Sequence, residues 1–246
     1  MKILFTNDDG YYSPGLKSLK QAFAGHEKWV MAPDGDRSGK SHAITLRKPL
    51  KVTRYSDTEF SCSGNPADCV LYSLAGAIPV RPDLIISGIN LGPNLGTDTV
   101  YSGTAAAARQ AALSGIPSIA VSSALFDEDQ DFSPVVKFLE ANIDQLFSLW
   151  APDFFININF PREMNGKVAI TRPSRRIYRD KVDTYVTPRG DTYLFLSGSL
   201  GDAGPEPDSD WNAVEEGYVS ISPIFLHPIN HSEEQIFKKA RFQVEK

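Results

Sequence analysis

Short apolar runs alternate with helix-like stretches from the N-terminus to about residue 160, and this alternation most restricts the possible folds. Each run ends at polar or chain-breaking residues, which is typical of a strand buried on both faces. Between the first two runs, Ser13-Pro14 is typical of a helix start and Gly25 of a helix end. Strand, helix and strand in this order predict a right-handed crossover and a parallel sheet. The runs are Ile3–Phe5, Trp29–Ala32, Leu84–Ile86, Ile119–Val121 and Phe154–Ile158.

Further helices are expected at three places, and one segment has an edge-strand pattern. The helices follow Asn65-Pro66, cover about Thr104–Leu113, and extend through the apolar positions of 135–146. Apolar and polar residues alternate over His42–Arg54, and Pro49 divides this segment. We therefore expect two antiparallel strands there, or an excursion at the edge of the sheet.

The chain changes character after Pro161. Residues 174–200 are rich in Arg, Tyr and Thr, and a Pro-Arg-Gly-Asp sequence lies in their middle. This pattern predicts a long hairpin that projects from the core. The stretch 201–212 that follows is expected to be an acidic loop.

The end of the chain adds a late strand and a helix. Val219–Ile221 has the pattern of a strand, and Ser232 with Gln235 forms a capping box for a terminal helix. We therefore expect an α/β core over 1–160 and an arm-like C-terminal part over 161–246.

Composition limits the class of protein. A chain of 246 residues with a net charge of −5 can bury a large core and offers no broad surface for a nucleic-acid polymer. Cys62 and Cys69 are interpreted as two small buried residues rather than a disulfide scaffold or a zinc motif. The chain has no apolar run of membrane-spanning length and no signal-peptide pattern at its start, so a cytoplasmic protein is expected.

An acidic pair, Asp8 and Asp9, directly follows the first predicted strand. In open α/β sheets, ligands bind at the carboxyl ends of the strands. Two adjacent carboxylates repel each other unless a cation compensates, and Mg²⁺ or Mn²⁺ is suited to carboxylate and water ligands. A turn or a helix cap explains the pair about equally well on these two residues alone.

Two later loops could supply neutral ligands to the same place. Ser38 follows the second strand, and Asn90 follows the strand over 84–86. Each could offer an oxygen atom to a cation shared with the acidic pair. The loop with Ser38 also carries Arg37, which could meet a phosphate, although a plain polar connection is the more common explanation.

The loop after 84–86 leads into a helix at Ser102-Gly103-Thr104. Hydroxyls and backbone N–H groups at a helix N-terminus favour phosphate binding, and helix capping is compatible with that role. The ending of a Walker A loop is missing, which disfavours ATP-driven motor chemistry. Asn65 could add to the pocket wall, but a plain helix start is the simpler interpretation.

Three further polar residues have no settled role from the sequence. His42 could serve in acid–base chemistry, but a lone histidine in a strand pattern is more often structural. Arg175 and Arg176 could steer an anionic substrate, and a structural pairing with the acidic loop 201–212 is slightly favoured.

Four motifs in this order resemble the SurE family, the survival-protein-E nucleotidases, and the resemblance covers essentially the whole chain. Each motif is weak alone, but the four in order are specific, and Gly217–Pro223 near the end adds to them. The four motifs are Thr6–Gly10, Ala32–Asp34 with Arg37-Ser38, Gly64–Cys69, and Ser87–Asn90 with Gly92–Asn94.

This resemblance implies a three-layer α/β core of Rossmann-like type with a mostly parallel sheet. It implies one divalent metal ion per subunit, held by Asp8, Asp9, Ser38 and Asn90. It also implies hydrolysis of nucleoside 5′-monophosphates or 3′-monophosphates, sometimes extended to polyphosphate. Members form homodimers or homotetramers by exchanging the C-terminal arm and helix, which matches the predicted hairpin.

These observations lead to a hypothesis of metal-assisted phosphomonoester hydrolysis. A bound ion would neutralise phosphate charge and lower the pKa of a water, and Asp8 or Asp9 would accept the water's proton. The phosphoryl oxygens would be held by Asn94, Ser102, Gly103 and Thr104.

Two other functions share an acidic residue after the first strand. A phosphatase with an aspartyl-phosphate intermediate would use Asp8 as the nucleophile, but it generally has Asp-x-Asp at this place. A receiver-like signalling domain would need a phosphoacceptor Asp after the third parallel strand and a later Lys. Neither stands out, and the chain is about twice too long for such a module.

Overall fold

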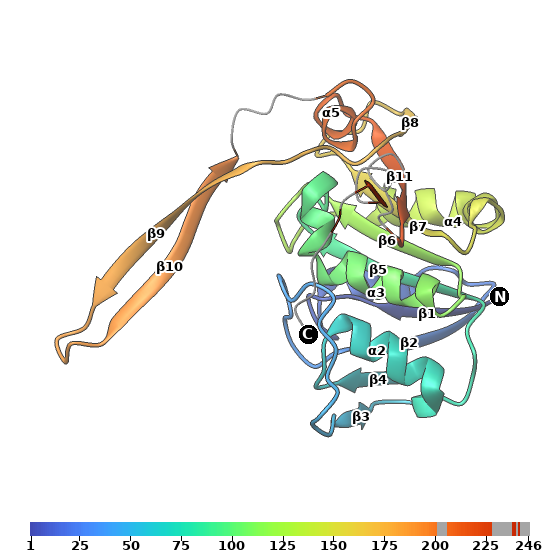
Figure 1. Cartoon of the computed structure of the whole chain (residues 1–246). Coiled ribbons are helices and arrows are strands. Elements are labelled where there is room, and N and C mark those ends of the chain that lie inside the picture. Colours follow the sequence, from blue (N-terminus) through green and yellow to red (C-terminus); the bar gives the residue numbers. More distant parts are fainter. Residues whose placement is uncertain (201–205, 228–237, 240, 242–246) are drawn as a thin grey trace.

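Parallel strands form the middle of one large sheet, as the alternation of apolar runs predicts. The structure is a computed structural model that describes residues 1–200, 206–227, 238–239 and 241. Apart from their ends, the strands of this central part are buried (Figure 1). They are β1 (Lys2–Thr6), β2 (Glu27–Pro33), β5 (Leu84–Leu91), β6 (Ser118–Ser123) and β7 (Phe154–Phe160).

The strand order places a crevice between β1 and β5. Within the described residues the sheet runs β3-β4-β2-β1-β5-β6-β7-β11-β8. From β1 the chain first proceeds to one side of the sheet and later returns to the other side at β5. Such a reversal of strand order leaves an opening at the carboxyl ends of the two strands, where ligands of open α/β sheets bind.

Helices cover both faces of the sheet, so the molecule has three layers. Side chains alternate across each strand, and in β1 the side chains of Ile3 and Phe5 belong to one core, whereas Leu4 belongs to the other. The first core is covered by α1 (Pro14–Gln21) and α4 (Ser133–Leu149), and the second by α2 (Pro66–Tyr72) and α3 (Gly103–Leu113). Two short helical segments precede or follow these: η1 (Ser73–Ala77) and η2 (Gly96–Val100).

At one edge of the sheet, the structure shows the predicted edge excursion rather than two antiparallel strands within 42–54. The segment 42–51 contains no strand, and only β3 (Val52–Arg54) forms, paired with the unpredicted β4 (Glu59–Cys62). At the other edge, β11 (Val219–Phe225) confirms the late strand, and the unpredicted β8 (Val168–Ile170) pairs with it. Both β8 and β11 extend the core sheet beyond β7, so the part after residue 160 is not confined to an arm.

Some helix boundaries also differ. Helix α1 ends at Gln21, before Gly25, because Phe23 has a left-handed backbone with φ of 57°. The stretch expected to be an acidic loop contains a short helix, α5 (Asp210–Glu215), which Ser209 caps through Asn212. The capping box of Ser232 and Gln235, with its terminal helix, lies outside the described residues.

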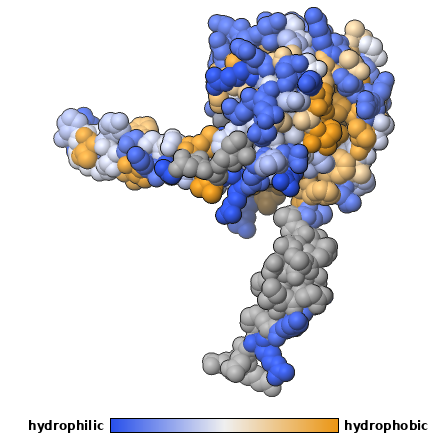
Figure 2. Space-filling model, turned by 90° about the horizontal axis from the view of Figure 1, so that it is seen from above, coloured by the Kyte–Doolittle hydropathy of each residue, from blue (hydrophilic) through white to orange (hydrophobic). Residues whose placement is uncertain are grey.

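The predicted hairpin is confirmed as an extended arm. It consists of β9 (Tyr178–Val186) and β10 (Thr192–Leu200), which pair only with each other and project away from the sheet (Figure 1). Figure 2 shows apolar residues along this arm. Elsewhere, Cys62 and Cys69 are buried and free, as predicted. Within the described part of the chain, no helix is long and apolar enough to cross a membrane.

Candidate active site

Oxygen-bearing side chains from two loops meet at the crevice between β1 and β5. Asp8 and Asp9 follow the end of β1, and Asn90 lies in the last residues of β5. The two strands are hydrogen-bonded neighbours, with Thr6 opposite Ser87. Their ends therefore bring the predicted ligands to one place, beside the N-terminus of α3.

Asp8 is held by the first turn of α3. Gly103 donates its backbone N–H to Oδ2 of Asp8 over 3.1 Å, and the Thr104 hydroxyl donates to Oδ1. The helix begins here because the Ser102 hydroxyl accepts a hydrogen bond from the backbone N–H of Ala105. Burial raises the pKa of Asp8, and the hydrogen bonds from Thr104 and Gly103 lower it.

Asp9 has one carboxylate oxygen that nothing satisfies within the described part of the chain. Its Oδ2 is buried and has no hydrogen-bond partner there. Burial, followed by the neighbouring charge of Asp8, raises the pKa of Asp9 to about 7. A half-buried carboxylate that repels its neighbour and has one buried oxygen without a donor is a position that a cation would stabilise.

Asn90 presents its carbonyl oxygen toward Asp8. Its amide nitrogen donates to the carbonyl oxygens of Leu91 and Gly92, over 3.2 and 2.8 Å, which fixes the orientation of the side chain. The carbonyl oxygen of Asn90 lies 3.2 Å from the Thr104 hydroxyl, the same hydroxyl that contacts Asp8. A single hydroxyl therefore touches oxygens from both loops.

Ser38 reaches the same cavity from the loop after β2. Its hydroxyl donates to Asp36 over 2.6 Å, which leaves its oxygen lone pairs available, and this bond lowers the pKa of Asp36. The loop is tied to the acidic pair because the backbone N–H of Arg37 donates to the carbonyl oxygen of Asp8 over 2.7 Å.

A cavity of about 570 Å³ opens above these side chains. Its wall brings together five of the predicted site residues, namely Asp8, Ser38, Asn90, Asn94 and Ser102. Gly103 and Thr104 do not line it, since both are buried behind Asp8 and direct their donors at that carboxylate. Three protein loops and one helix start thus converge on one opening.

Asn94 is anchored deep in the wall of the cavity. Its amide nitrogen donates to the Ser122 hydroxyl over 2.8 Å, and its backbone N–H donates to the side chain of Asn159 over 2.8 Å. Its carbonyl oxygen accepts from Asn157 over 2.9 Å. The two asparagines of β7 were not among the predicted site residues, although two polar side chains in a buried strand were a visible signal.

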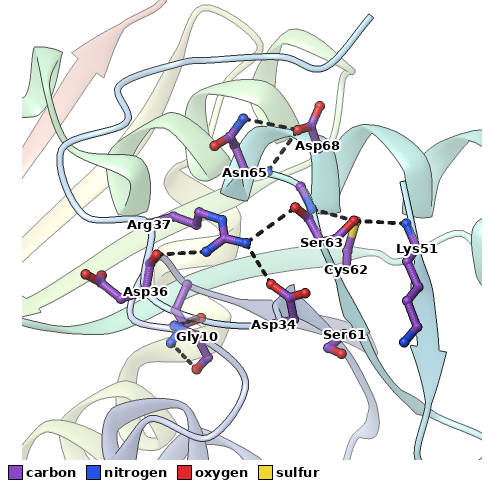
Figure 3. A network of polar contacts seen from close by, with 12 residues as sticks. Gly10, Asp34, Asp36, Arg37, Lys51, Ser61, Cys62, Ser63, Asn65 and Asp68 are labelled. Carbon is purple, nitrogen blue, oxygen red and sulfur yellow. Dashed lines mark hydrogen bonds and ion pairs between the residues drawn. The ribbon is translucent and has the colours of Figure 1, made fainter. Parts of the chain in front are cut away.

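Asn65 and Arg37 have structural partners next to the site (Figure 3). Asn65 begins α2, and its backbone N–H donates to the Asp68 carboxylate over 2.8 Å, so the simpler interpretation of a helix start is the one that the structure shows. The Arg37 guanidinium pairs with Asp34 over 2.7 Å and donates to the carbonyl oxygen of Ser63 over 3.4 Å. These bonds brace the loop that carries Ser38.

The base of the arm closes one side of the cavity. The Tyr178 hydroxyl donates to Asp98 over 2.5 Å, and Arg176 lies 3.3 Å from the other oxygen of Asp98. The Arg176 guanidinium also stacks over Trp211 at 5.0 Å from the ring centroid. Arg176 thus has the structural role that was slightly favoured, but within the described residues its acidic partner is Asp98 of η2 and its contact with the stretch 201–212 is the ring of Trp211.

His42 has a structural contact, as the more common interpretation held. Its Nε2 lies 3.0 Å from the side-chain oxygen of Gln110 on α3. Asp98, Tyr101, Phe126 and Tyr178 also line the cavity and were not among the predicted site residues. These residues come from segments that show no motif and meet only in the folded chain.

The donor set at this site fits a hard divalent cation. Two carboxylates, one amide oxygen and one hydroxyl are the oxygen ligands that Mg²⁺ and Mn²⁺ accept. Within the described residues, no group of three or more His, Cys, Asp or Glu side chains is arranged to hold a metal. A metal here would therefore depend on the neutral oxygens as well as on the acidic pair.

Comparison with known proteins settles the family. The family profile described as "Survival protein SurE" matches residues 3–180. The chain belongs to the SurE family. It is 43% identical over 235 residues to a protein named 5′-nucleotidase SurE from Desulfitobacterium hafniense, covering 91% of this chain and 90% of that one. It is 37% identical over 250 residues to a protein of the same name from Desulforudis audaxviator, covering 97% of each.

The fold of this SurE chain is also that of a solved member. The crystal structure of the SurE protein from Aquifex aeolicus superposes with a TM-score of 0.82 at 33% identity, covering 97% of this chain and 98% of that one. The resemblance inferred from the four sequence motifs is therefore confirmed, as is the three-layer α/β fold with its C-terminal hairpin.

Proposed function

We propose that this SurE chain is a metal-dependent phosphomonoesterase that hydrolyses nucleoside 5′-monophosphates to nucleoside and phosphate. Nucleoside 3′-monophosphates and short-chain polyphosphate are proposed as further substrates. The name 5′-nucleotidase SurE, carried by relatives that are about as long as this chain, supports the reaction. The observation that carries the proposal is the unpartnered, buried oxygen of Asp9, directly next in the chain to Asp8, which lines one cavity with Ser38 and Asn90.

In this proposal, Asp8, Asp9, Ser38 and Asn90 hold one divalent ion, Mg²⁺ or Mn²⁺. The ion, when bound, supplies positive charge for a phosphate oxygen and lowers the pKa of a water. Gly103 and Thr104 fix Asp8 for this task, while Asp9 accepts the proton of the attacking water. The hydroxyl of Ser102 accepts from Ala105 and keeps its own hydrogen, which it donates to a phosphoryl oxygen.

Asp8 is poorly placed for the alternative role of nucleophile. Both of its oxygens accept hydrogen bonds, and its exposed fraction is 3%. A phosphatase with an aspartyl-phosphate intermediate needs a carboxylate oxygen that is aimed at phosphorus, whereas a metal ligand can keep its hydrogen bonds and bind the cation through a second lone pair. We therefore favour direct attack by water.

The deciding experiment measures phosphate release from AMP with Mg²⁺, Mn²⁺ or EDTA, for the wild type and Asp8→Asn. We expect turnover that needs the metal and falls by more than about a hundredfold in the variant. Circular dichroism checks that the variant is folded. Undiminished turnover in EDTA, or in Asp8→Asn, would remove the proposal, and a phosphoenzyme trapped by acid quench would favour the covalent route.

We also propose that the arm joins subunits into a homodimer or homotetramer. Among the described residues its strands pair only with each other, and it exposes a series of large apolar side chains to solvent. These are Val182, Tyr185, Val186, Tyr193, Leu194, Phe195 and Leu196. A surface of this kind on an isolated ribbon is typical of a protein–protein contact.

A further inference from the structure

Two exposed aromatic side chains lie on the wall of the cavity that Asp8 lines. Phe126, in the loop after β6, has an exposed fraction of 69%, and Tyr101, between η2 and α3, one of 60%. Both line the same cavity as Asp8, Ser38 and Asn90. An apolar ring that remains open to solvent beside convergent polar groups is typical of a ligand-binding surface.

Phe126 is the better supported of the two rings. It packs against Gly92, since a Cβ atom at that glycine would lie 2.3 Å from the Cε1 atom of the ring. Only a residue without a side chain allows this approach, and Gly92 also has a φ of 93°. The ring is therefore supported on the loop that carries Asn90, while the rest of its surface is open.

The loop under Phe126 is fixed by hydrogen bonds. The backbone N–H of Gly92 donates to the carbonyl oxygen of Leu125 over 3.0 Å. The Gln130 side chain donates to the same carbonyl oxygen over 3.3 Å and accepts from the Ser123 hydroxyl over 2.6 Å. These bonds hold the backbone next to Phe126, so little ordering of the loop would be needed when a ligand binds.

Other exposed rings are less suited to a ligand. Tyr55 stacks on Tyr11 with ring centroids 4.2 Å apart, and Tyr12 packs edge-on against both. None of these three lines the cavity. Among the described residues, no aromatic ring packs against Phe126.

We propose that Phe126 is the platform on which the nucleobase of the substrate stacks while the phosphate lies at Asp8, Asp9 and Asn90. This inference rests on the proposed function and deepens it by naming a residue that determines the substrate class. Stacking on a phenyl ring does not depend on which base is bound, because every base has a π-face and the ring has no polar atom that could select one base. Purine nucleotides should be favoured for their larger stacked area, and any base should be accepted.

The test compares AMP with ribose 5-phosphate, which has the same phosphate and sugar but lacks the base. For Phe126→Ala we expect kcat/KM for AMP to fall about tenfold, equal to about 1.4 kcal/mol, with ribose 5-phosphate changed less than twofold. Phe126→Trp should keep the wild-type ratio. Phe147→Ala, at a half-exposed ring on α4 away from the cavity, is the matched control and should change neither substrate.

Isothermal titration calorimetry with Mn²⁺ and the non-hydrolysable phosphonate analogues of both ligands repeats the comparison without turnover. If the wild type binds both ligands but hydrolyses neither, the proposed function fails, and the binding ratios still decide whether Phe126 stacks the base. Equal losses for AMP and ribose 5-phosphate in Phe126→Ala would overturn the platform. So would unchanged values for both, or a loss selective for AMP in Tyr101→Ala and absent in Phe126→Ala.

Discussion

The hydroxyl of Thr104 donates a hydrogen bond to the carboxylate of Asp8, which joins the start of α3 to the loop after β1. The same hydroxyl lies 3.2 Å from the carbonyl oxygen of Asn90, so it sets the spacing of two proposed metal ligands. Thr104 itself does not reach the cavity. It therefore acts on the site through Asp8. A search for phosphate-binding motifs does not reveal this indirect role of Thr104.

Replacing Thr104 by Val should destabilise the chain by about 1.5–3 kcal/mol, because a buried carboxylate then loses a donor. Thr104→Ser keeps the hydroxyl and should lose much less. The free energy of unfolding is measured by urea denaturation at pH 8 in EDTA, and phosphate release from AMP is measured in parallel. A Val variant that is as stable as the wild type, or more stable than the Ser variant, would show that the methyl group matters and the hydrogen bond does not.

Gly103 tests the close approach of α3 to Asp8. A Cβ atom at this position would lie 2.7 Å from the Cβ atom of Asp8 and 2.9 Å from its Oδ2. Gly103→Ala should therefore displace the carboxylate and lower both Mn²⁺ affinity and kcat/KM for AMP by at least about tenfold. Gly25→Ala is the control, since nothing lies within 4 Å of its Cβ position. A Gly103→Ala variant with unchanged Mn²⁺ affinity would contradict the assignment of Asp8 as a ligand.

The central sheet could be predicted because its strands are short, continuous and apolar, and local patterns alone identify them. The edge strands could not, because β8 is three residues long and partly exposed, so it lacks a distinct period. The segment 42–51 misled the prediction for a different reason. It alternates like a strand but forms a loop. A contact with α2 holds this loop in place, in which Thr45 donates to the buried carboxylate of Asp68 over 2.8 Å.

The part of the candidate site that lies in loops directly after strand ends could be predicted from the sequence. Asp8 and Asn90 lie together because strand ends of a parallel sheet meet at one edge, which the strand order alone dictates. The contacts of Asp98 with Arg176 and Tyr178 depend on how the base of the arm packs against the core. No local sequence pattern predicts that packing. Phe126 escaped notice for a similar reason, since a single aromatic residue in an acidic loop carries no motif.

The pKa of Asp9, raised to about 7, predicts how stability depends on pH in the absence of metal. Between about pH 4 and pH 7 the folded chain keeps a proton on Asp9 that the unfolded chain has released. The free energy of unfolding should therefore fall as the pH rises through this window. Asp9→Asn cannot titrate and lacks this contribution. Urea denaturation in EDTA at pH 5, 6, 7 and 8 should show the wild type losing stability relative to the variant.

Metal should reverse this effect for the wild type. At pH 8 the positive charge of Mn²⁺ compensates the negative carboxylate of Asp9. Mn²⁺ should therefore raise the unfolding midpoint of the wild type and leave that of Asp9→Asn nearly unchanged. A stability difference between the two proteins that stays constant from pH 5 to pH 8 would show that Asp9 titrates normally.

The arm predicts a change in assembly that leaves the core intact. Val186 and Leu194 lie on one face of the ribbon, with exposed fractions of 66% and 65%. Changing both to Lys places charges in the proposed contact, where desolvation is costly, so the oligomer should dissociate. Light scattering after size-exclusion chromatography should then give a mass near the 27.1 kDa of one chain. Asp191→Lys adds charge at the exposed turn of the same hairpin and should keep the oligomer. An unchanged mass for the double variant would place the subunit contact elsewhere.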